Sequence, residues 1–144
     1  MTTTSLVTLD RSECLRLLAG APVGRVVHTD RALPACTPVN FRLVGEAVVF
    51  RTAASSRLAA ATADAVVAFE VDDIDPVTGT GWTVLVTGVA TAVRDVSTLV
   101  RLDQLGLVAW AGPDRQHWVR ITVADVSGRR VTAPTDALAA TTAS

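Results

Sequence analysis

Hydrophobic and polar residues alternate along much of this chain, which is the pattern of strands with two different faces. The clearest example is residues 37–43, where Val39, Phe41 and Leu43 are separated by Asn40 and Arg42. A short turn at residues 44–46 leads to a second β-rich run at residues 47–52. Further strands are predicted at residues 24–29, 65–71, 82–93 and 117–123, followed by a final turn and pairing segment at residues 125–131.

Three helices are predicted between these strands. The first covers residues 9–18 and is capped by Asp10 or Ser12, whose side-chain oxygens can accept from free backbone N–H groups. A second helix of about eight residues begins at Ser56, where a hydroxyl precedes an alanine-rich run. The third covers residues 95–107 and is amphipathic. Its apolar side carries Leu99, Leu102 and Leu105.

About six strands joined mainly by short turns favour an antiparallel barrel with helices at its rims over a doubly wound parallel sheet. The fold class is therefore mainly β, within the α+β class. A chain of 144 residues is most simply one domain. We expect that domain to cover residues 9–132, between a flexible N-terminal tail at residues 1–8 and a flexible C-terminal tail at residues 133–144.

Composition removes several classes of function. The net charge is −1, so electrostatics give no case for a nucleic acid or an anionic membrane as partner. All basic residues are arginine, which excludes pyridoxal phosphate held as a lysine Schiff base. The N-terminal residues lack the pattern of a signal peptide, and no run is long enough to cross a bilayer. We expect a cytoplasmic protein in which Cys14 and Cys36 are buried free thiols.

No cluster of residues forms a recognisable metal site or acid–base centre. The carboxylates of Asp72, Asp73 and Asp75 lack the spacing and the late glutamate of a calcium loop. His28 and His117 belong to no nucleophile motif and have no metal-ligand spacing, so both are read as strand residues. This absence fits an enzyme in which a cofactor carries the chemistry and the protein binds and orients it. No catalytic residue and no metal is therefore assigned.

The start of the second predicted helix carries an arginine where the helix dipole favours an anion. Ser55 or Ser56 can cap this helix, and Arg57 lies in or near its first turn. Two hydroxyls, free N–H donors and a forked cation would together suit a phosphate group. The alternative is a capped surface helix with a solvated arginine.

The same stretch resembles a known family. Phe50-Arg51-Thr52, followed by Ser56-Arg57-Leu58, resembles the phosphate clamp of the flavin-binding split-barrel proteins, the family of pyridoxamine 5′-phosphate oxidase. The oxidases show a second aromatic residue where this chain has Arg51 and a lysine where it has Leu58. The resemblance extends over residues 9–131. Its other specific segments are Pro38-Val39-Asn40-Phe41 and Gly81 to Gly88.

The resemblance implies a six-stranded antiparallel split β-barrel with flanking helices and a cofactor at the interface of a homodimer. FMN is the expected cofactor, and the expected activity is that of a flavin-dependent oxidoreductase. In such relatives the strand at Pro38–Phe41 runs beside the flavin ring, and an aromatic residue on the long strand of the opposite protomer, here Trp82, lies near it. The cofactor-binding residues predicted in this way are Pro38, Val39, Asn40, Phe41, Arg51, Thr52, Ser55, Ser56, Arg57, Trp82, Trp118 and Arg120.

Two alternatives remain at this point. One is the deazaflavin F420 in the same fold, whose longer anionic tail demands a basic groove. Few arginines cluster outside Arg51 and Arg57, which favours FMN. The other is a non-catalytic split barrel that has lost its ligand or that holds haem. Oxidation of pyridoxamine phosphate itself is disfavoured because the chain is short and lacks the extra basic substrate clamp of the oxidases.

The long strand at residues 82–93 supplies an independent reason to expect a dimer. Both of its faces are apolar or β-branched, so neither is suited to water. One face can fill a small barrel, which leaves the other in need of cover. A two-fold contact with a second copy provides that cover without another domain.

Overall fold

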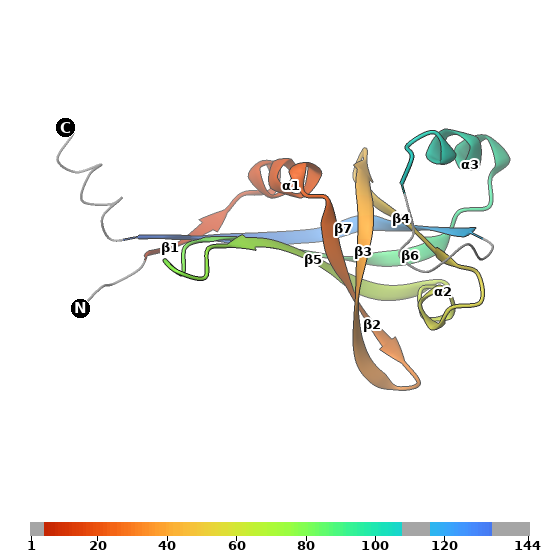
Figure 1. Cartoon of the computed structure of the whole chain (residues 1–144), viewed down its shortest axis with the longest axis horizontal. Coiled ribbons are helices and arrows are strands. Elements are labelled where there is room, and N and C mark those ends of the chain that lie inside the picture. Colours follow the sequence, from red (N-terminus) through yellow and green to blue (C-terminus); the bar gives the residue numbers. More distant parts are fainter. Residues whose placement is uncertain (1–4, 108–115, 134–144) are drawn as a thin grey trace.

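The computed structural model of the chain describes residues 5–107 and 116–133, which fold into a strongly twisted antiparallel sheet with three helices (Figure 1). The strands are β1 (Ser5–Leu9), β2 (Val23–Asp30), β3 (Leu33–Val44), β4 (Ala47–Ala53), β5 (Ala65–Ile74), β6 (Gly81–Ala92) and β7 (Gln116–Thr132). The helices are α1 (Arg11–Gly20), α2 (Arg57–Ala61) and α3 (Val96–Asp103).

The sheet closes on itself. Its strand order is β1-β7-β4-β3-β2-β5-β6, and β6 also pairs with β7. Strands β2 to β7 therefore form a six-stranded ring in which every pairing is antiparallel, while β1 extends the edge of β7. The ring is uneven: β6 and β7 pair along twelve positions, whereas β3 and β4 pair at only four. The predicted six-stranded antiparallel split barrel is confirmed.

The N-terminal segment differs from the sequence prediction. Residues 5–8, expected in a flexible tail, belong to β1, which pairs with the last residues of β7 in the register Ser5–Thr132 to Leu9–Gly128. The physical reason is the length of β7, which has 17 residues. Its C-terminal half pairs with β6 on one edge only, and β1 supplies hydrogen-bond partners for the other edge. The tail predicted at residues 133–144 lies, from residue 134 on, outside the described residues.

Several boundaries also move. The helix α1 begins after Asp10, whose carboxylate caps it by accepting from the amide of Glu13 at 2.8 Å. The helix α2 has five residues instead of about eight, and the hydroxyl of Thr62 donates to the carbonyl of Leu58 at 2.6 Å at its end. The strand β5 runs to Ile74, so the loop predicted from residue 72 begins three residues later.

The last strand is continuous where a turn was predicted. Residues 116–132 form one strand, and the extra residue is absorbed by a bulge opposite the step from Thr87 to Gly88 of β6. A bulge bends a strand and increases its twist without ending its pairing. The 17-residue strand can therefore pair with β4 at one end and β1 at the other.

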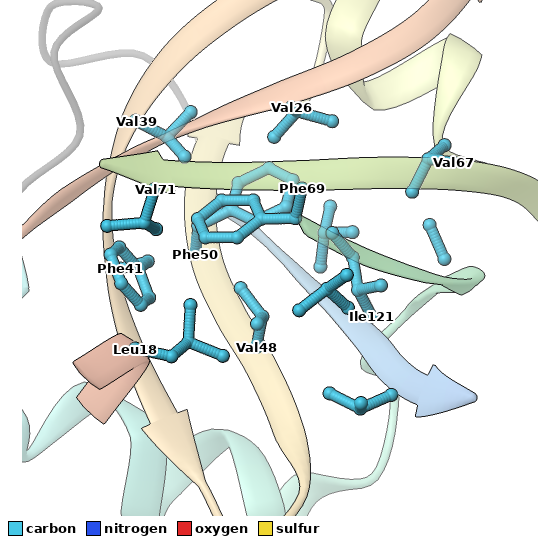
Figure 2. Packing of buried hydrophobic residues seen from close by; sticks show 14 of the residues in the cluster. Leu18, Val26, Val39, Phe41, Val48, Phe50, Val67, Phe69, Val71 and Ile121 are labelled. Atoms are coloured by element: carbon cyan, nitrogen blue, oxygen red, sulfur yellow. The ribbon is translucent and has the colours of Figure 1, made fainter. Parts of the chain in front are cut away.

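The inward faces of the strands form the main core. Figure 2 shows Phe41, Phe50 and Phe69 among Val, Leu and Ile side chains inside the ring. The rings of Phe41 and Phe69 meet edge to face, with centroids 4.8 Å apart, a geometry worth about 0.5–1.5 kcal/mol beyond the buried area. A second cluster lies on the outer face of β4 and β7 under α3 and contains Val49, Val93, Leu102, Leu107 and Trp118.

The two cysteines lie in different environments. Cys14 of α1 is fully buried against Gly128 of β7, as expected. Cys36 is exposed on β3, which corrects the prediction that both thiols are buried. Its side chain points outward because Val39 and Phe41, three and five residues later, point into the core.

Gly88→Ala is expected to lower the free energy of unfolding by about 1–3 kcal/mol, because the new Cβ would overlap the carbonyl oxygen of Thr122 across the bulge. Urea unfolding at equal protein concentration measures this loss. Gly20→Ala is the matched control, since nothing lies within 4 Å of its Cβ position; its effect should stay within about 0.5 kcal/mol. Equal losses in the two variants would contradict the expected close approach.

Candidate functional site

The barrel is split between β3 and β4, and the predicted site lies at this split. Their pairing extends from Phe41–Phe50 to the hairpin turn. Before Phe41, β3 pairs with β2, and after Phe50, β4 continues beside β7. The two strands therefore diverge and leave a cavity of about 90 Å³ between them. The residues that line it are Thr37, Pro38, Val39, Asn40, Arg51, Thr52 and Leu58.

Five of the residues predicted for cofactor binding line this cavity together: Pro38, Val39, Asn40, Arg51 and Thr52. Thr37 and Leu58 were not predicted as site residues. The alternation of β3 could have indicated Thr37, which has the same parity as Val39. Phe41 was predicted but lies elsewhere, because its side chain is 1% exposed in the core and its amide donates to the carbonyl of Pro22 at 3.4 Å.

Two hydroxyls, one from β4 and one from the cap of α2, lie beside each other at the end of the cavity. Ser56, not Ser55, caps the helix, because its Oγ accepts from the amide of Ala59 at 3.0 Å. The hydroxyl of Thr52 lies 2.9 Å from that of Ser56. The helix has only five residues, so its macrodipole adds little. The hydroxyls and nearby arginines are therefore the groups that can hold an anion here.

Arg57 points away from the cavity between β3 and β4. Its side chain is 67% exposed, and its guanidinium lies 3.7 Å from the carboxylate of Asp30 at the end of β2. Together with Thr29, Arg31 and residues of α2 it lines a neighbouring open cavity of about 420 Å³. Arg57 is therefore available to a group that extends beyond α2.

Arg51 is the cation that the fold holds inside the site. Its guanidinium lies over the ring of Trp118, 5.0 Å from the centroid, and donates to the carbonyl of Leu107 at 3.1 Å. The Nε atom of Arg51 is buried and has no hydrogen-bond partner among the described residues. A buried donor without a partner costs free energy unless something accepts from it. An acceptor group on a bound molecule would supply the missing partner.

The ring of Trp118 packs against the guanidinium of Arg51 and holds it in place. It is 3% exposed, and its Nε1 donates to the carboxylate of Asp103 at the end of α3 at 2.8 Å. Trp118 thus connects the cavity to the helix α3. Its position beside Arg51 follows from the cross-strand pairing of these two residues between β4 and β7.

Two further predicted site residues, Trp82 and Arg120, lie apart from the cavity at the split within the chain. Trp82 lies at the start of β6 and lines a separate cavity of about 300 Å³ with Arg25, Asp72 and Asp73. Arg120 is exposed on β7 and lines a fourth cavity, under α3. A single chain therefore does not bring Trp82 or Arg120 to the residues at the split.

The outer face of β2, β5 and β6 combines apolar residues with one ionic group. Val27, Val66, Leu85 and Val89 are 38%, 72%, 43% and 46% exposed. Beside them Arg25 donates to the carboxylates of Glu70 and Asp72 at 3.0 and 3.2 Å. Burial, followed by the hydrogen bond with Asp72, raises the pKa of Glu70 above its usual range.

Metal binding and acid–base chemistry receive no support from the described residues. In residues 5–107 and 116–133 no group of three His, Cys, Asp or Glu side chains could hold a metal ion. His117 lies opposite Thr52, and burial, then the charge of Arg94, lowers its pKa. His28 is buried, and its Nε2 lies 3.0 Å from the hydroxyl of Thr37. Within the same ranges, none of the helices has the length and hydrophobicity required to span a membrane.

This geometry defines a split barrel with a cavity at the split, and comparison with known proteins agrees with the fold. The model of the family described as pyridoxamine 5′-phosphate oxidase matches residues 10–130. An uncharacterized protein of Mycobacterium tuberculosis, Rv0080, is 44% identical over 133 residues, covering 89% of this chain and 87% of the relative.

Solved structures show the same fold. The FAD-binding protein of Mycobacterium smegmatis is 34% identical, with a TM-score of 0.69 over 88% of this chain and 98% of that one. A FAD-binding protein of Mesorhizobium loti is 20% identical, with a TM-score of 0.74 over 88% and 99% of the two chains, which supports the fold alone. The chain belongs to the pyridoxamine 5′-phosphate oxidase family.

Proposed function

We propose that this protein binds a flavin nucleotide at the split between β3 and β4, that it does so as a homodimer, and that it is an oxidoreductase. The observation that carries the proposal is the cavity at the split, lined by Arg51, whose buried Nε has no hydrogen-bond partner among the described residues. The FAD-binding relative from M. smegmatis supports the choice of a flavin as ligand. When bound, the flavin supplies the electron-transfer chemistry.

The residues of the split fit a phosphorylated, partly apolar ligand. The hydroxyls of Thr52 and Ser56 can donate to phosphate oxygens, and Arg57 can add a charge-assisted hydrogen bond. The segment Pro38–Asn40 and Leu58 supply apolar surface for a ring, and the Asn40 amide offers both donors and acceptors. Arg51 is held rigidly by Trp118, so it loses little conformational freedom when a ligand binds.

The outer face of β2, β5 and β6 supports the proposed dimer. Val66 and Val89 are directly opposite each other on β5 and β6, and Leu85 follows on the same face of β6. A second copy seated on this apolar patch would remove it from water. It would also allow Trp82 of the partner subunit to complete the cavity that one chain leaves open.

FMN is the proposed cofactor, and FAD is the second candidate. Two observations make FAD the second candidate. The cavity of about 420 Å³ next to Arg57 has room for a larger nucleotide and is also lined by Arg31, and the M. smegmatis relative binds FAD. The deazaflavin F420 is less compatible, because its longer anionic tail demands a basic groove and, among the described residues, this cavity is lined by only two arginines, Arg31 and Arg57.

The proposal is tested by titrating FMN, FAD and riboflavin, which has no phosphate, into the purified chain and following flavin fluorescence. We expect both nucleotides to bind at least about ten-fold more tightly than riboflavin, because only they offer phosphate to the hydroxyls and to Arg57. Equal binding of riboflavin would contradict the phosphate contacts. Absence of binding by all three would contradict the proposed function.

A further inference from the structure

We propose that the cavity under α3 is a second ligand site, which binds a small amphipathic carboxylate with an apolar body and one anionic end. The cavity has a volume of about 300 Å³ and lies between α3 and the outer face of β4 and β7. Its volume is at the lower end of the range for small-molecule sites. This proposal does not depend on flavin binding.

The cavity results from the packing of a short helix on a strongly twisted sheet. Leu102 of α3 and Val49 of β4 are buried in the cluster under the helix. Towards the β3–β4 turn, however, the sheet offers Val44, which is 46% exposed, and the small side chain of Ala47, while Leu105 beyond the end of α3 is 36% exposed. The space between these residues remains open and has mainly apolar walls.

Two arginines meet this apolar space from opposite walls. Arg120 projects from β7 opposite Val49 of β4, and Arg101 comes from the last turn of α3. In the part of the chain that the structure describes, neither guanidinium forms an ion pair with a carboxylate. Arg101 donates only to the hydroxyl of Thr98, at a long 3.4 Å.

The acidic residues at the ends of α3 are already engaged. Asp95 caps the helix and accepts from Ser97 and from the amide and hydroxyl of Thr98. Asp103 accepts from Trp118 at 2.8 Å. The hydrogen bond from Thr98 is the largest cause that lowers the pKa of Asp95, and the charge of Arg101 is one of the smaller causes. Among the described residues, however, neither Arg101 nor Arg120 forms an ion pair with a carboxylate. Arginine pairs with carboxylates through two parallel hydrogen bonds.

Both parts of the ligand follow from this arrangement. An inorganic anion would leave the exposed apolar side chains of Val44 and Leu105 in contact with water, whereas an apolar body of matching size is stabilised by its burial against them. A neutral apolar molecule would leave Arg101 and Arg120 unpaired and partly desolvated. A carboxylate with a short hydrocarbon chain meets both requirements, because its chain covers the apolar side chains and its charge pairs with the arginines.

The site is separate from the split between β3 and β4. No lining residue is shared by the two cavities. Trp118 packs against Val49 and Leu102 on the one side and under Arg51 on the other, so it lies between them. A ligand under α3 can thus be measured in the presence of a saturating flavin.

The test is calorimetric titration of the full chain with decanoate, decanol and inorganic phosphate. We expect decanoate to bind at least about ten-fold more tightly than decanol, because only decanoate offers a charge to the arginines, and phosphate to show no binding at the same concentrations. Saturating FMN should leave decanoate affinity unchanged. Equal affinity of decanol and decanoate, or displacement of decanoate by FMN, would overturn the proposal.

Three variants locate the site. Arg101→Gln and Arg120→Gln are each expected to weaken decanoate binding about ten-fold, while Arg16→Gln, which removes an exposed arginine of α1, should have no effect. Ala47→Leu adds volume inside the cavity and should abolish binding, with thermal unfolding measured to show that the variant is folded. Binding equal to wild type in the two cavity arginine variants, or in folded Ala47→Leu, would refute the assignment.

Discussion

Leu85→Arg is expected to convert a dimer into a monomer and to abolish flavin binding at the same time. Leu85 is 43% exposed in the apolar patch formed with Val66 and Val89. Interfaces of obligate dimers bury on the order of 2,000 Å² or more, and a two-fold contact would place the new charge in both halves of a buried surface. Burying an unpaired charge costs several kcal/mol, enough to raise the dimer dissociation constant more than about 100-fold.

The variant should stay folded, because Leu85 is 43% exposed in the single chain and the new guanidinium can remain in water there. The matched control is Val77→Arg, which introduces the same arginine side chain at a valine that is 91% exposed in the β5–β6 connection. Val86 is unsuitable, since its side chain is fully buried and a charge there would test the core.

Sedimentation velocity with absorbance detection of protein and flavin reads both outcomes in one run. We expect wild type and Val77→Arg to sediment as dimers with flavin, and Leu85→Arg to sediment as a flavin-free monomer. A wild-type monomer that carries flavin at micromolar concentration would contradict the shared site. A Leu85→Arg dimer would show that this face is not the interface.

Arg57→Ala is expected to weaken FMN binding by about 1.5–3 kcal/mol, or roughly ten- to 150-fold, because it removes a charge-assisted hydrogen bond to phosphate. The exposed position of Arg57 favours the lower end of this range, since water screens the charge. Fluorescence titration of FMN against both proteins measures the change.

One further variant and one further ligand test whether the effect of Arg57→Ala comes from the phosphate. Asp30→Asn removes the carboxylate 3.7 Å from Arg57 and should strengthen FMN binding slightly, because the phosphate no longer competes for the guanidinium. Riboflavin should bind wild type and Arg57→Ala equally, because it carries no phosphate. Unchanged FMN affinity in Arg57→Ala would mean that Arg57 is only a surface charge paired with Asp30.

Local pattern was sufficient for most strands, and long-range pairing decided the rest. The alternation around Phe41 and the turn at Gly45 predict the β3–β4 hairpin because inward and outward residues differ in polarity there. The strand β1 could not be predicted in this way: Ser5–Leu9 is mostly exposed and becomes a strand only because the edge of β7 needs partners. The same edge explains why β7 continues through the predicted turn.

For the candidate site, residue types and their order predicted the segment but not the geometry. Pro38–Asn40, Thr52 and Ser56 were found from the sequence because strand, turn and cap signals depend on neighbours along the chain. The roles of the arginines depend on residues far away in sequence: Trp118 and Leu107 hold Arg51 in the cavity, whereas Asp30 draws Arg57 away from it.

The sequence by itself therefore determined the antiparallel barrel, the family and the strand that carries the candidate site, because hydrophobic periodicity and short motifs are local properties. Only the tertiary structure decided that β3 and β4 are not paired with each other before Phe41 and after Phe50, that Arg51 is the cation in the cavity wall, and that Val27, Val66, Leu85 and Val89 form one exposed face. These features arise from the register and twist of strands distant in sequence, which bring side chains together through cross-strand pairing.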